Sequence, residues 1–591
     1  MQTFSKKFLR FIQQPAFLAF VYFVGMSIVM TYPMIMKMRT EAVGAGGGDG
    51  TYFIWLVAWY QKAIFQLHIS PFFAPSLNYP QGWNLATTDI TPAMVALALP
   101  GSLLISPTFG YNFAMLLSFI LSGWGMYLWV KHLAGDSLAS LVAGTVFAFL
   151  PFRMAHFMVG HLNLLGTQWF PFYFWGLFDL LKQEKFSWKP VLMAGIAAGL
   201  IGMTSPYYIY MTVLISVVFL LGFVIFKGYK RLKYAAFWKS LLAFGVLAVL
   251  LVGLAMLPYL NLNFQNGLAS RPAEYLNRYS ASPTDFVIPS IKHFLWGNWI
   301  DVTFSPEIFQ ESTLYIGAVA FVLAGFAWIK RRQLRHPELA DIALLVAAAG
   351  FVLALGIQLH WLGQPFILYW RGKQVTSLPR ILQPIFHRVD MPTIYLPAYY
   401  LFRYLPFFSK MRVMMRFGLF TLIFTSLMAG LGAYLLTKSA SSNVKRWVGI
   451  AVLVLVFIDF YPGVLHGFSV TQARPVDSWL AVQPNTGAVA QFPFDEESSQ
   501  GQVYDTLVHQ KPFLGGDFNA NEPEQYRRIQ PVMDTFPSQK SVDQLRRLGV
   551  TYVVVDSSRY VSYSELDRKI QSFGLQLLHV SEAEYVYGLS K

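Results

Sequence analysis

A glycine run with a single acid is the first stretch of this sequence that could carry chemistry. Asp49 lies in the run GGGDG at residues 46–50, after the first long apolar segment and directly before a tryptophan-rich stretch. Glycine lets a backbone turn sharply and approach a ligand closely. A carboxylate at a membrane surface can act as a general base or hold a metal ion. The alternative is that Asp49 only caps a helix that begins near Thr51.

The positions of the basic loops predict how the chain is oriented in a membrane. In that orientation, further polar residues lie together on one side. Charged groups within a membrane domain cost about 2.5–3.5 kcal/mol each on the insertion scale, so unpaired ones usually mark function. Acids that accept a proton or bind Mg²⁺ or Mn²⁺, beside arginines that bind phosphate, suit transfer from a phosphorylated lipid. Asp49 is the candidate catalytic residue and the candidate metal ligand. The candidates for substrate binding are Asp89, Arg153, His156, His161, Tyr207, Tyr208, Glu311, Arg412 and Arg416.

The acid and the two histidines among these candidates also have structural interpretations. Asp89 can cap the helix that follows it. His156 and His161 are five residues apart, which separates them by about 140° around a helix. That angle is poor for a shared metal ion and favours a structural or hydrogen-bonding role.

The other candidates have structural interpretations as well. Arginines near a membrane surface can extend to the lipid headgroups, and Arg412 and Arg416, four residues apart, would share one helical face. Tyr207 and Tyr208 can belong to an aromatic belt at the interface. Glu311 can be a helix-opening acid favoured by the helix dipole.

The composition is that of an integral membrane protein. Apolar residues make up 55% of the chain and charged residues 13%, and many apolar runs are long enough to cross ~30 Å of hydrocarbon. The net charge of +15 comes from basic clusters between apolar runs, which is typical of cytoplasmic loops that face anionic lipid and not of a nucleic-acid surface. The chain has no cysteine, which excludes disulfides and thiolate-bound metals.

Hydropathy and charge predict a polytopic α-helical protein of about eleven spans. Lys6, Lys7 and Arg10 place the N-terminus in the cytoplasm, ahead of a retained signal anchor. The predicted spans are 15–36, 110–131, 137–152, 163–181, 189–204, 207–226, 238–258, 313–329, 339–357, 413–437 and 447–463, with a re-entrant half-helix at 92–105. The basic loops at 131–136, 182–188, 227–239, 330–338 and 438–446 then all lie inside. The loop at 358–412 goes against the tendency of basic loops to lie inside, because it carries seven cations and one acid but lies outside in this topology.

The composition changes near residue 470 to that of a soluble domain. Strands are expected at 488–494 and 551–555, and short helices at 542–548 and 564–573. We therefore predict a membrane domain at 1–468, with its first outer loop at 37–109, and an extracytoplasmic α/β domain at 469–591. This domain has no glycine-rich phosphate loop and no nucleophile motif, and the chain has no repeat of fixed period.

Several motifs resemble those of a large group of bacterial membrane proteins within the GT-C superfamily of glycosyltransferases. That superfamily includes protein mannosyltransferases and lipid A aminoarabinose transferases. The first outer loop carries Gly48-Asp49 with Trp55 and Trp59, and then the segment FAPSLNYP at 73–80. The similar motifs continue at 111–112, 151–153, 160–163, 168–169, 282–285, 412–417 and 545–555, and so cover most of the chain. The commonest GT-C pattern has two adjacent or closely spaced acids in this loop, whereas Glu41 and Asp49 here are eight apart, which puts a metal requirement in doubt.

The resemblance implies a membrane glycosyltransferase of the bacterial cell membrane with a polyprenyl-phosphate sugar as donor. Asp49 would be the base or a metal ligand, and Arg412 and Arg416 would stabilise the released polyprenyl phosphate. The half-helix and the 358–412 loop would shape a lipid groove. The outer domain would contact a glycan, lipid or protein acceptor or cover the site.

Two other functions fit the same composition. A transporter or flippase of lipid-linked sugars would show repeat symmetry and polar groups near mid-membrane; the absence of a repeat and the one-sided polar cluster favour the enzyme. A non-catalytic cell-envelope assembly protein would depend on its outer domain and not on Asp49.

Overall fold

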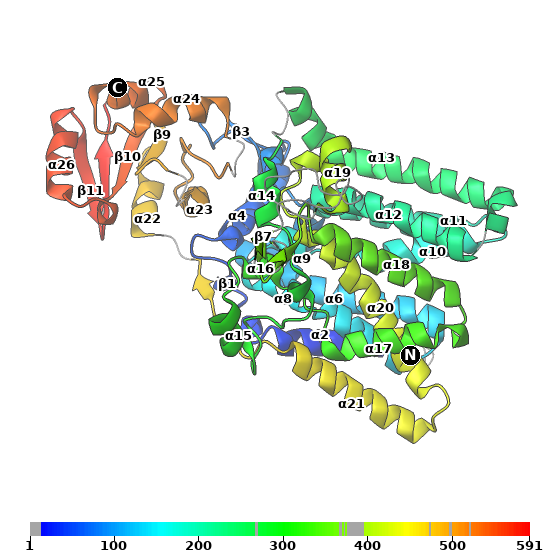
Figure 1. Cartoon of the computed structure of the whole chain (residues 1–591). Helices are drawn as coiled ribbons and strands as arrows, with labels where there is room; N and C mark the ends of the chain where they lie inside the picture. Colours follow the sequence, from blue (N-terminus) through cyan, green and yellow to red (C-terminus); the bar gives the residue numbers. More distant parts are fainter. Residues whose placement is uncertain are drawn as a thin grey trace, which may run out of the picture.

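The structure is a computed structural model that describes residues 14–227, 229–265, 270–365, 369–370, 373–374, 395–471, 474–495, 499–518 and 522–590. It is mostly helical. A bundle of long helices carries a smaller C-terminal unit with a mixed sheet at one end (Figure 1).

A helix occupies each of the eleven predicted spans. These helices are α2 (Pro15–Met30), α6 (Pro107–Ala134), α7 (Ser137–Ala148), α10 (Phe170–Lys182), α11 (Trp188–Thr204), α12 (Pro206–Lys227), α13 (Ala235–Gln265), α17 (Ala318–Ile329), α18 (Pro337–Ala354), α20 (Gly418–Thr437) and α21 (Ser442–Phe460). By length and apolarity, five segments of the described chain can cross a membrane, namely α6, α12, most of α13, α18 and 415–437. A sixth forms if α7 and the bent α8 (Pro151–Met158) count as one span. The chain is thus an integral membrane protein, and the count of eleven stays a prediction.

Shorter helices lie at the end of the bundle that faces the C-terminal unit. The predicted half-helix is present as α5 (Pro92–Leu104), which packs on α6. It is also bonded to α4 (Asp49–Lys62), because the Ser102 hydroxyl donates to the Gln61 side-chain oxygen at 2.6 Å. The others are α3 (Met34–Lys37), α9 (Leu162–Leu165), α14 (Ala273–Arg278), α15 (Gly297–Phe304), α16 (Phe309–Ser312) and α19 (Pro397–Tyr404).

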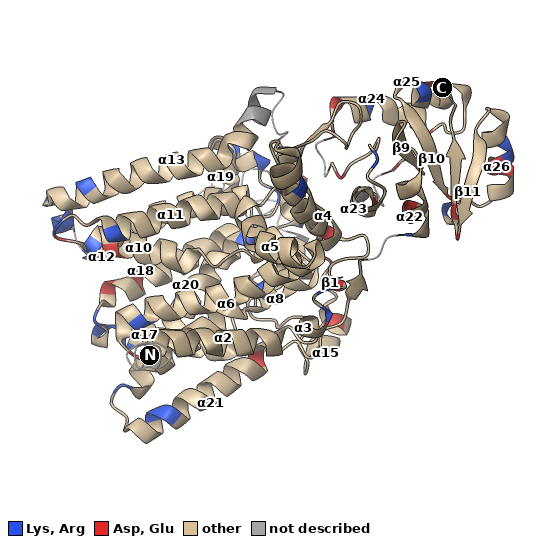
Figure 2. Ribbon diagram, turned by 180° about the vertical axis from the view of Figure 1, so that it is seen from behind, with Lys and Arg blue, Asp and Glu red and all other residues tan. Residues whose placement is uncertain are grey.

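The basic loops lie together at the opposite end of the bundle. Figure 2 shows Lys and Arg at the ends of α10, α12, α13 and α21 that are far from the C-terminal unit. This arrangement agrees with the predicted inner side, although which side faces the cytoplasm stays a prediction. In the 358–412 loop, Arg371, Arg380, Arg388 and Asp390 lie outside the described residues.

The C-terminal unit is a four-stranded mixed sheet with helices around it. The strand order is β11-β12-β10-β9, in which β9 (Ala488–Phe492) and β10 (Val550–Asp556) are parallel and the other pairs antiparallel. These two strands and the helices α25 (Gln539–Arg547) and α26 (Tyr563–Ser572) confirm the predicted elements. Five further elements of this unit were not predicted, namely β11 (Gln576–Ser581), β12 (Glu584–Gly588), α22 (Pro475–Val482), α23 (Ser499–His509) and α24 (Glu524–Met533).

The first loop of the bundle is docked against the C-terminal unit. β1 (Glu41–Val43) pairs with β8 (Phe468–Val470), and α4 packs along α23. The Trp55 indole donates to the Thr506 hydroxyl at 3.3 Å, and the Phe513 amide donates to the Ser76 carbonyl at 2.7 Å. Side chains of the C-terminal unit therefore reach the segment that carries Asp49.

Candidate active site

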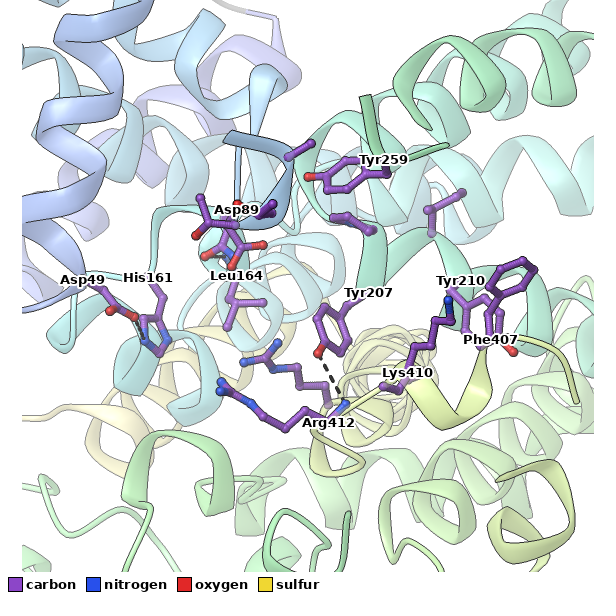
Figure 3. A pocket seen from close by; sticks show the side chains of 18 of the residues that line it. Asp49, Asp89, His161, Leu164, Tyr207, Tyr210, Tyr259, Phe407, Lys410 and Arg412 are labelled. Atoms are coloured by element: carbon purple, nitrogen blue, oxygen red, sulfur yellow. Dashed lines mark hydrogen bonds and ion pairs between the residues drawn. The ribbon is translucent and has the colours of Figure 1, made fainter. Parts of the chain in front are cut away.

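A cavity of about 610 Å³ lies where α4, α12, α13, the segment 407–416 and the C-terminal unit meet. Figure 3 shows Asp49 and His161 at one end, Asp89 beside them, and Tyr210, Phe407 and Lys410 at the other. Of the predicted site residues, the cavity is lined by Asp49, Asp89, His161, Tyr207, Glu311, Arg412 and Arg416.

Two glycine backbones in close contact bring Asp49 to His161. Gly50 follows Asp49, and Gly160 precedes His161. A Cβ on Gly160 would lie 2.8 Å from the Gly50 Cα, and Gly160 also has a φ of +82°, a region that other residues rarely adopt. The glycine run therefore has the close-approach role that its composition predicts, with another segment of the chain as the partner.

Asp49 does not cap the helix. It is the first residue of α4, the capping position belongs to Gly48, and no side-chain cap bond is present. One carboxylate oxygen lies 2.8 Å from the His161 Nε2, and the other accepts from the Gln500 amide at 2.7 Å. Burial raises the pKa of Asp49, but these two contacts and the charge of Arg412 outweigh burial and lower it. Asp49 is therefore ionised at neutral pH, with 42% of its side chain exposed.

Asp89 does not cap the following helix either. Thr91 holds the capping position of α5 and makes no side-chain cap bond. The Tyr52 and Tyr60 hydroxyls donate to the carbonyls of Asp89 and Ile90, at 3.3 and 3.0 Å, and fix this segment to α4. Burial raises the pKa of the Asp89 carboxyl, partly offset by the charge of Arg416 and a hydrogen bond from Asn163.

Glu311 and Arg416 form a buried ion pair. The Arg416 Nε lies 3.1 and 3.2 Å from the two Glu311 oxygens, and both side chains are almost fully buried. Burial raises the pKa of Glu311, but the charge of Arg416 outweighs it and brings the pKa to about 2. Glu311 is therefore the ion partner of Arg416 and lies in α16, before the predicted span.

Arg412 and Arg416 do not share a helical face. Arg412 lies in an irregular segment, Arg416 in a 3₁₀ turn (η7, Met415–Phe417), and α20 begins only at Gly418. Both still line the cavity. The Arg412 backbone amide donates to the Tyr207 hydroxyl at 3.3 Å, shown as a dashed line in Figure 3. The prediction of one shared helix was wrong because residues 411–413 have no helical structure and α20 begins after both arginines.

Three predicted residues do not line the cavity. Arg153 is fully buried and donates to the Ser118 and Leu165 carbonyls, at 3.1 and 3.2 Å; it neither reaches the headgroups nor lines the cavity. Tyr208 is buried and donates to the Leu164 carbonyl. His156 is buried behind His161, with their Nδ1 atoms 2.8 Å apart.

Several other lining residues were not predicted from the sequence, among them Tyr52, Tyr259, Arg271 and Asp517, and neither was Gln500, which bonds Asp49. Gln500 and Asp517 come from the C-terminal unit. No local pattern marks Gln500 or Asp517, because each reaches the cavity only by packing between segments that are far apart in the chain.

A metal centre does not fit the residues that the structure describes. No three His, Asp or Glu side chains among them form a group that could hold an ion. The Asp49 carboxylate is already engaged by His161 and Gln500, and Glu311 by Arg416. The candidate Mg²⁺ or Mn²⁺ therefore has no ligand set here, and we derive no step through a metal.

The sequence itself assigns the family. The model of a domain of unknown function, DUF6311, matches residues 17–383. The chain belongs to the DUF6311 family. The matched region holds Asp49, Asp89, His161 and Glu311, whereas Arg412, Arg416 and the residues from the C-terminal unit lie beyond it. No curated protein matches the sequence.

The fold of this DUF6311 chain is similar to that of several solved structures. Arabinofuranosyltransferase AftD from Mycobacteria superposes with a TM-score of 0.56 at 14% identity, over 97% of this chain and 41% of AftD. The Archaeoglobus fulgidus oligosaccharyltransferase superposes with a TM-score of 0.51 at 12% identity, over 98% of this chain and 74% of the oligosaccharyltransferase chain. ArnT from Cupriavidus metallidurans, solved bound to undecaprenyl phosphate, superposes with a TM-score of 0.49 at 12% identity, over 96% of this chain and 98% of ArnT. The superpositions on AftD and on the oligosaccharyltransferase show that the fold is similar to that of GT-C glycosyltransferases.

Proposed function

We propose that this protein is a membrane glycosyltransferase that moves a sugar from a polyprenyl-phosphate donor to an extracytoplasmic acceptor. The observation that carries the proposal is the composition of one cavity. It holds an ionised carboxylate, Asp49, and a cation, Arg412, whose charge acts on that carboxylate, and it continues into an apolar wall. The GT-C-like fold supports the same function.

The cationic and apolar end suits the lipid phosphate. Arg412, Lys410 and Arg271 line the cavity together with Val213, Val252 and Met256 of α12 and α13. Lys410 lies at the end away from Asp49, and the Arg412 side chain reaches toward His161 (Figure 3). Much of α13 is exposed, so a prenyl chain could lie along it while its phosphate meets the cations. Arg416 is neutralised by Glu311, which makes Arg412 the stronger candidate for charge-assisted hydrogen bonds to phosphate.

Asp49 suits the role of general base. In the proposed step, the acceptor hydroxyl oxygen forms a bond to the anomeric carbon of the donor sugar, and its proton passes to Asp49. The bond from that carbon to the phosphate oxygen breaks, and the polyprenyl phosphate leaves with the electron pair, stabilised by Arg412. Every atom and charge in this step is supplied by the donor, the acceptor and the described side chains.

The acceptor would enter beside the C-terminal unit. Gln500 and Asp517 place polar groups of that unit at the Asp49 end of the cavity, where they could bind hydroxyl groups of a glycan, glycolipid or protein. We therefore propose that residues 469–591 form an extracytoplasmic domain that completes the site. The membrane domain at 1–468 would hold the donor in the bacterial cell membrane, with the N-terminus inside.

Arg412→Ala is expected to weaken binding of polyprenyl phosphate by about 10- to 100-fold, because hydrogen bonds to charged groups contribute roughly 1.5–3 kcal/mol. Binding can be measured with a fluorescent polyprenyl phosphate and the purified protein in lipid nanodiscs. Arg403→Ala is the matched control, because Arg403 is an exposed arginine of α19 that does not line the cavity. Equal affinity of both variants and the wild type would rule out Arg412 as the phosphate ligand.

A further inference from the structure

Large apolar side chains are exposed on α15 and on the turn before it, although neither belongs to a predicted membrane span. Trp296, Trp299 and Val302 have 55%, 61% and 80% of their surface exposed. The turn that leads into α15 adds Phe294 and Leu295, which are 44% and 56% exposed. Single exposed apolar residues are common on any protein, but a group of this kind marks a surface that contacts something else.

The exposed apolar side chains of α15 share one sector of the helix. Trp296, Trp299 and Val302 are three residues apart in sequence, so they fall within about 120° around the helix axis. The other sectors hold the buried Gly297 and Ile300 and the exposed polar residues Asn298 and Asp301. One side of α15 therefore packs on the protein, one side presents polar groups, and one side presents an apolar surface.

Backbone and ring contacts fix α15 at the end of α21. The Phe294 amide donates to the Tyr461 carbonyl at 3.3 Å, and the centroids of their rings lie 5.5 Å apart. The His293 Nε2 lies 3.1 Å from the Ile458 carbonyl oxygen. Figure 1 shows α15 at the end of α21 that is nearest to the C-terminal unit. Because α21 occupies the last predicted span, the apolar side of α15 lies where a span ends.

A second segment exposes apolar side chains at the same end of the bundle. The Leu465 amide donates to the Tyr32 carbonyl at 3.0 Å, which joins the chain after α21 to the chain after α2. Tyr32, Ile35 and Met36 are 42%, 42% and 76% exposed, and Val464 is 52% exposed. The apolar side of α15 thus has apolar neighbours at the ends of two predicted spans.

We propose that α15 is an interfacial helix that inserts Trp296, Trp299 and Val302 into the lipid leaflet on the side of the C-terminal unit. Tryptophan is enriched at the boundary between membrane and water, and a helix with one apolar side can lie in the plane of that boundary. The exposed Lys292 before α15 can place its ammonium group among the lipid headgroups. The partner of this surface is therefore the lipid bilayer.

The inserted segments hold the junction between the helix bundle and the C-terminal unit at the membrane surface. The chain after α3 continues into β1, which leads to Asp49, and the chain after α21 continues into β8. These two strands pair with each other. The lipid contact therefore fixes the height of the Asp49 segment over the bilayer, whatever reaction the cavity supports.

Single spin labels can test the position of α15, because the chain has no cysteine of its own. The purified protein would be placed in nanodiscs that contain only this chain and phospholipid. A nitroxide on Val302→Cys is expected to be accessible to oxygen, which partitions into lipid, and to lose accessibility to a nickel chelate dissolved in water. Val561→Cys is the matched control, because Val561 is a fully exposed valine of the C-terminal unit. Its label should be accessible to the nickel chelate.

Three further positions on α15 test which side of the helix meets lipid. A label on Trp299→Cys should behave like the label on Val302→Cys, whereas labels on Asn298→Cys and Asp301→Cys should be more accessible to the nickel chelate. All four side chains are exposed, so thermal unfolding of these variants should match the wild type. Equal nickel accessibility at all four positions would overturn the proposal. Protection of Val302→Cys from both reagents would also overturn it, because a second copy of the chain would then cover this surface.

Discussion

Asp49→Asn is expected to lower sugar transfer by about 10³-fold, within the range that a positioned general base contributes. Asparagine has nearly the same shape, although its single carbonyl oxygen can accept only one of the two contacts that His161 and Gln500 make to separate Asp49 oxygens. It cannot take the proton of an acceptor hydroxyl. The loss should therefore appear in kcat and not in the affinity for the donor. Initial rates of polyprenyl-phosphate release measure both.

The control for this variant is Asp301→Asn. Asp301 is an exposed acid in α15 that does not line the cavity, so its replacement should leave the rate unchanged. Thermal unfolding of both variants should match the wild type. An Asp49→Asn protein with full activity would remove Asp49 from the mechanism and return it to a structural role at the start of α4.

Glu311→Met is expected to lower the free energy of unfolding by about 3–5 kcal/mol, which is typical when one partner of a buried ion pair is removed. The change keeps the side-chain volume but leaves the Arg416 guanidinium buried without its counter-charge. Thermal or denaturant unfolding in lipid or detergent gives the difference from the wild type.

Two further variants test the reason for that loss. Glu307→Ala breaks an ion pair whose side chains are 56% and 73% exposed, and such pairs contribute about 0–1 kcal/mol. The double variant Glu311→Met, Arg416→Met removes both buried charges and should be more stable than Glu311→Met alone. A double variant that is less stable than the single one would show that Arg416 stabilises the fold by other contacts.

The pH dependence of this ion pair has a defined direction. Because the pKa of Glu311 is lowered to about 2 from 4.5 in the unfolded chain, the pair stabilises the fold fully above pH 4.5. Its contribution is lost as the pH falls toward 2. Between pH 5 and 8 the difference in stability between the wild type and Glu311→Met should therefore not depend on the Glu311 carboxyl.

The helices and part of the site could be predicted from local sequence. Apolar runs long enough to span hydrocarbon mark helices whatever they pack against, so each predicted span holds a helix. The glycines around Asp49 signal a close backbone approach, which the structure shows between Gly50 and Gly160. His161 is a candidate for a different reason, because it falls with the other polar residues on one side of the predicted membrane domain.

The remainder depends on contacts that no local pattern records. Glu311 and Arg416 are 105 residues apart, and Asp49 and Gln500 are 451 apart. The same limit explains Arg153. Its charge in a membrane domain suggested a function, but its guanidinium binds the carbonyls of Ser118 and Leu165, which only the folded chain brings to it.

Mass spectrometry can detect directly whether the protein releases polyprenyl phosphate from a lipid-linked sugar. The purified protein in lipid would be incubated with a panel of polyprenyl-phosphate sugars, a membrane extract as the source of acceptors, and EDTA or Mg²⁺. We expect release by the wild type and by Asp301→Asn from at least one donor, with or without metal, and none above background by Asp49→Asn. Release by Asp49→Asn at the wild-type rate would contradict this expectation.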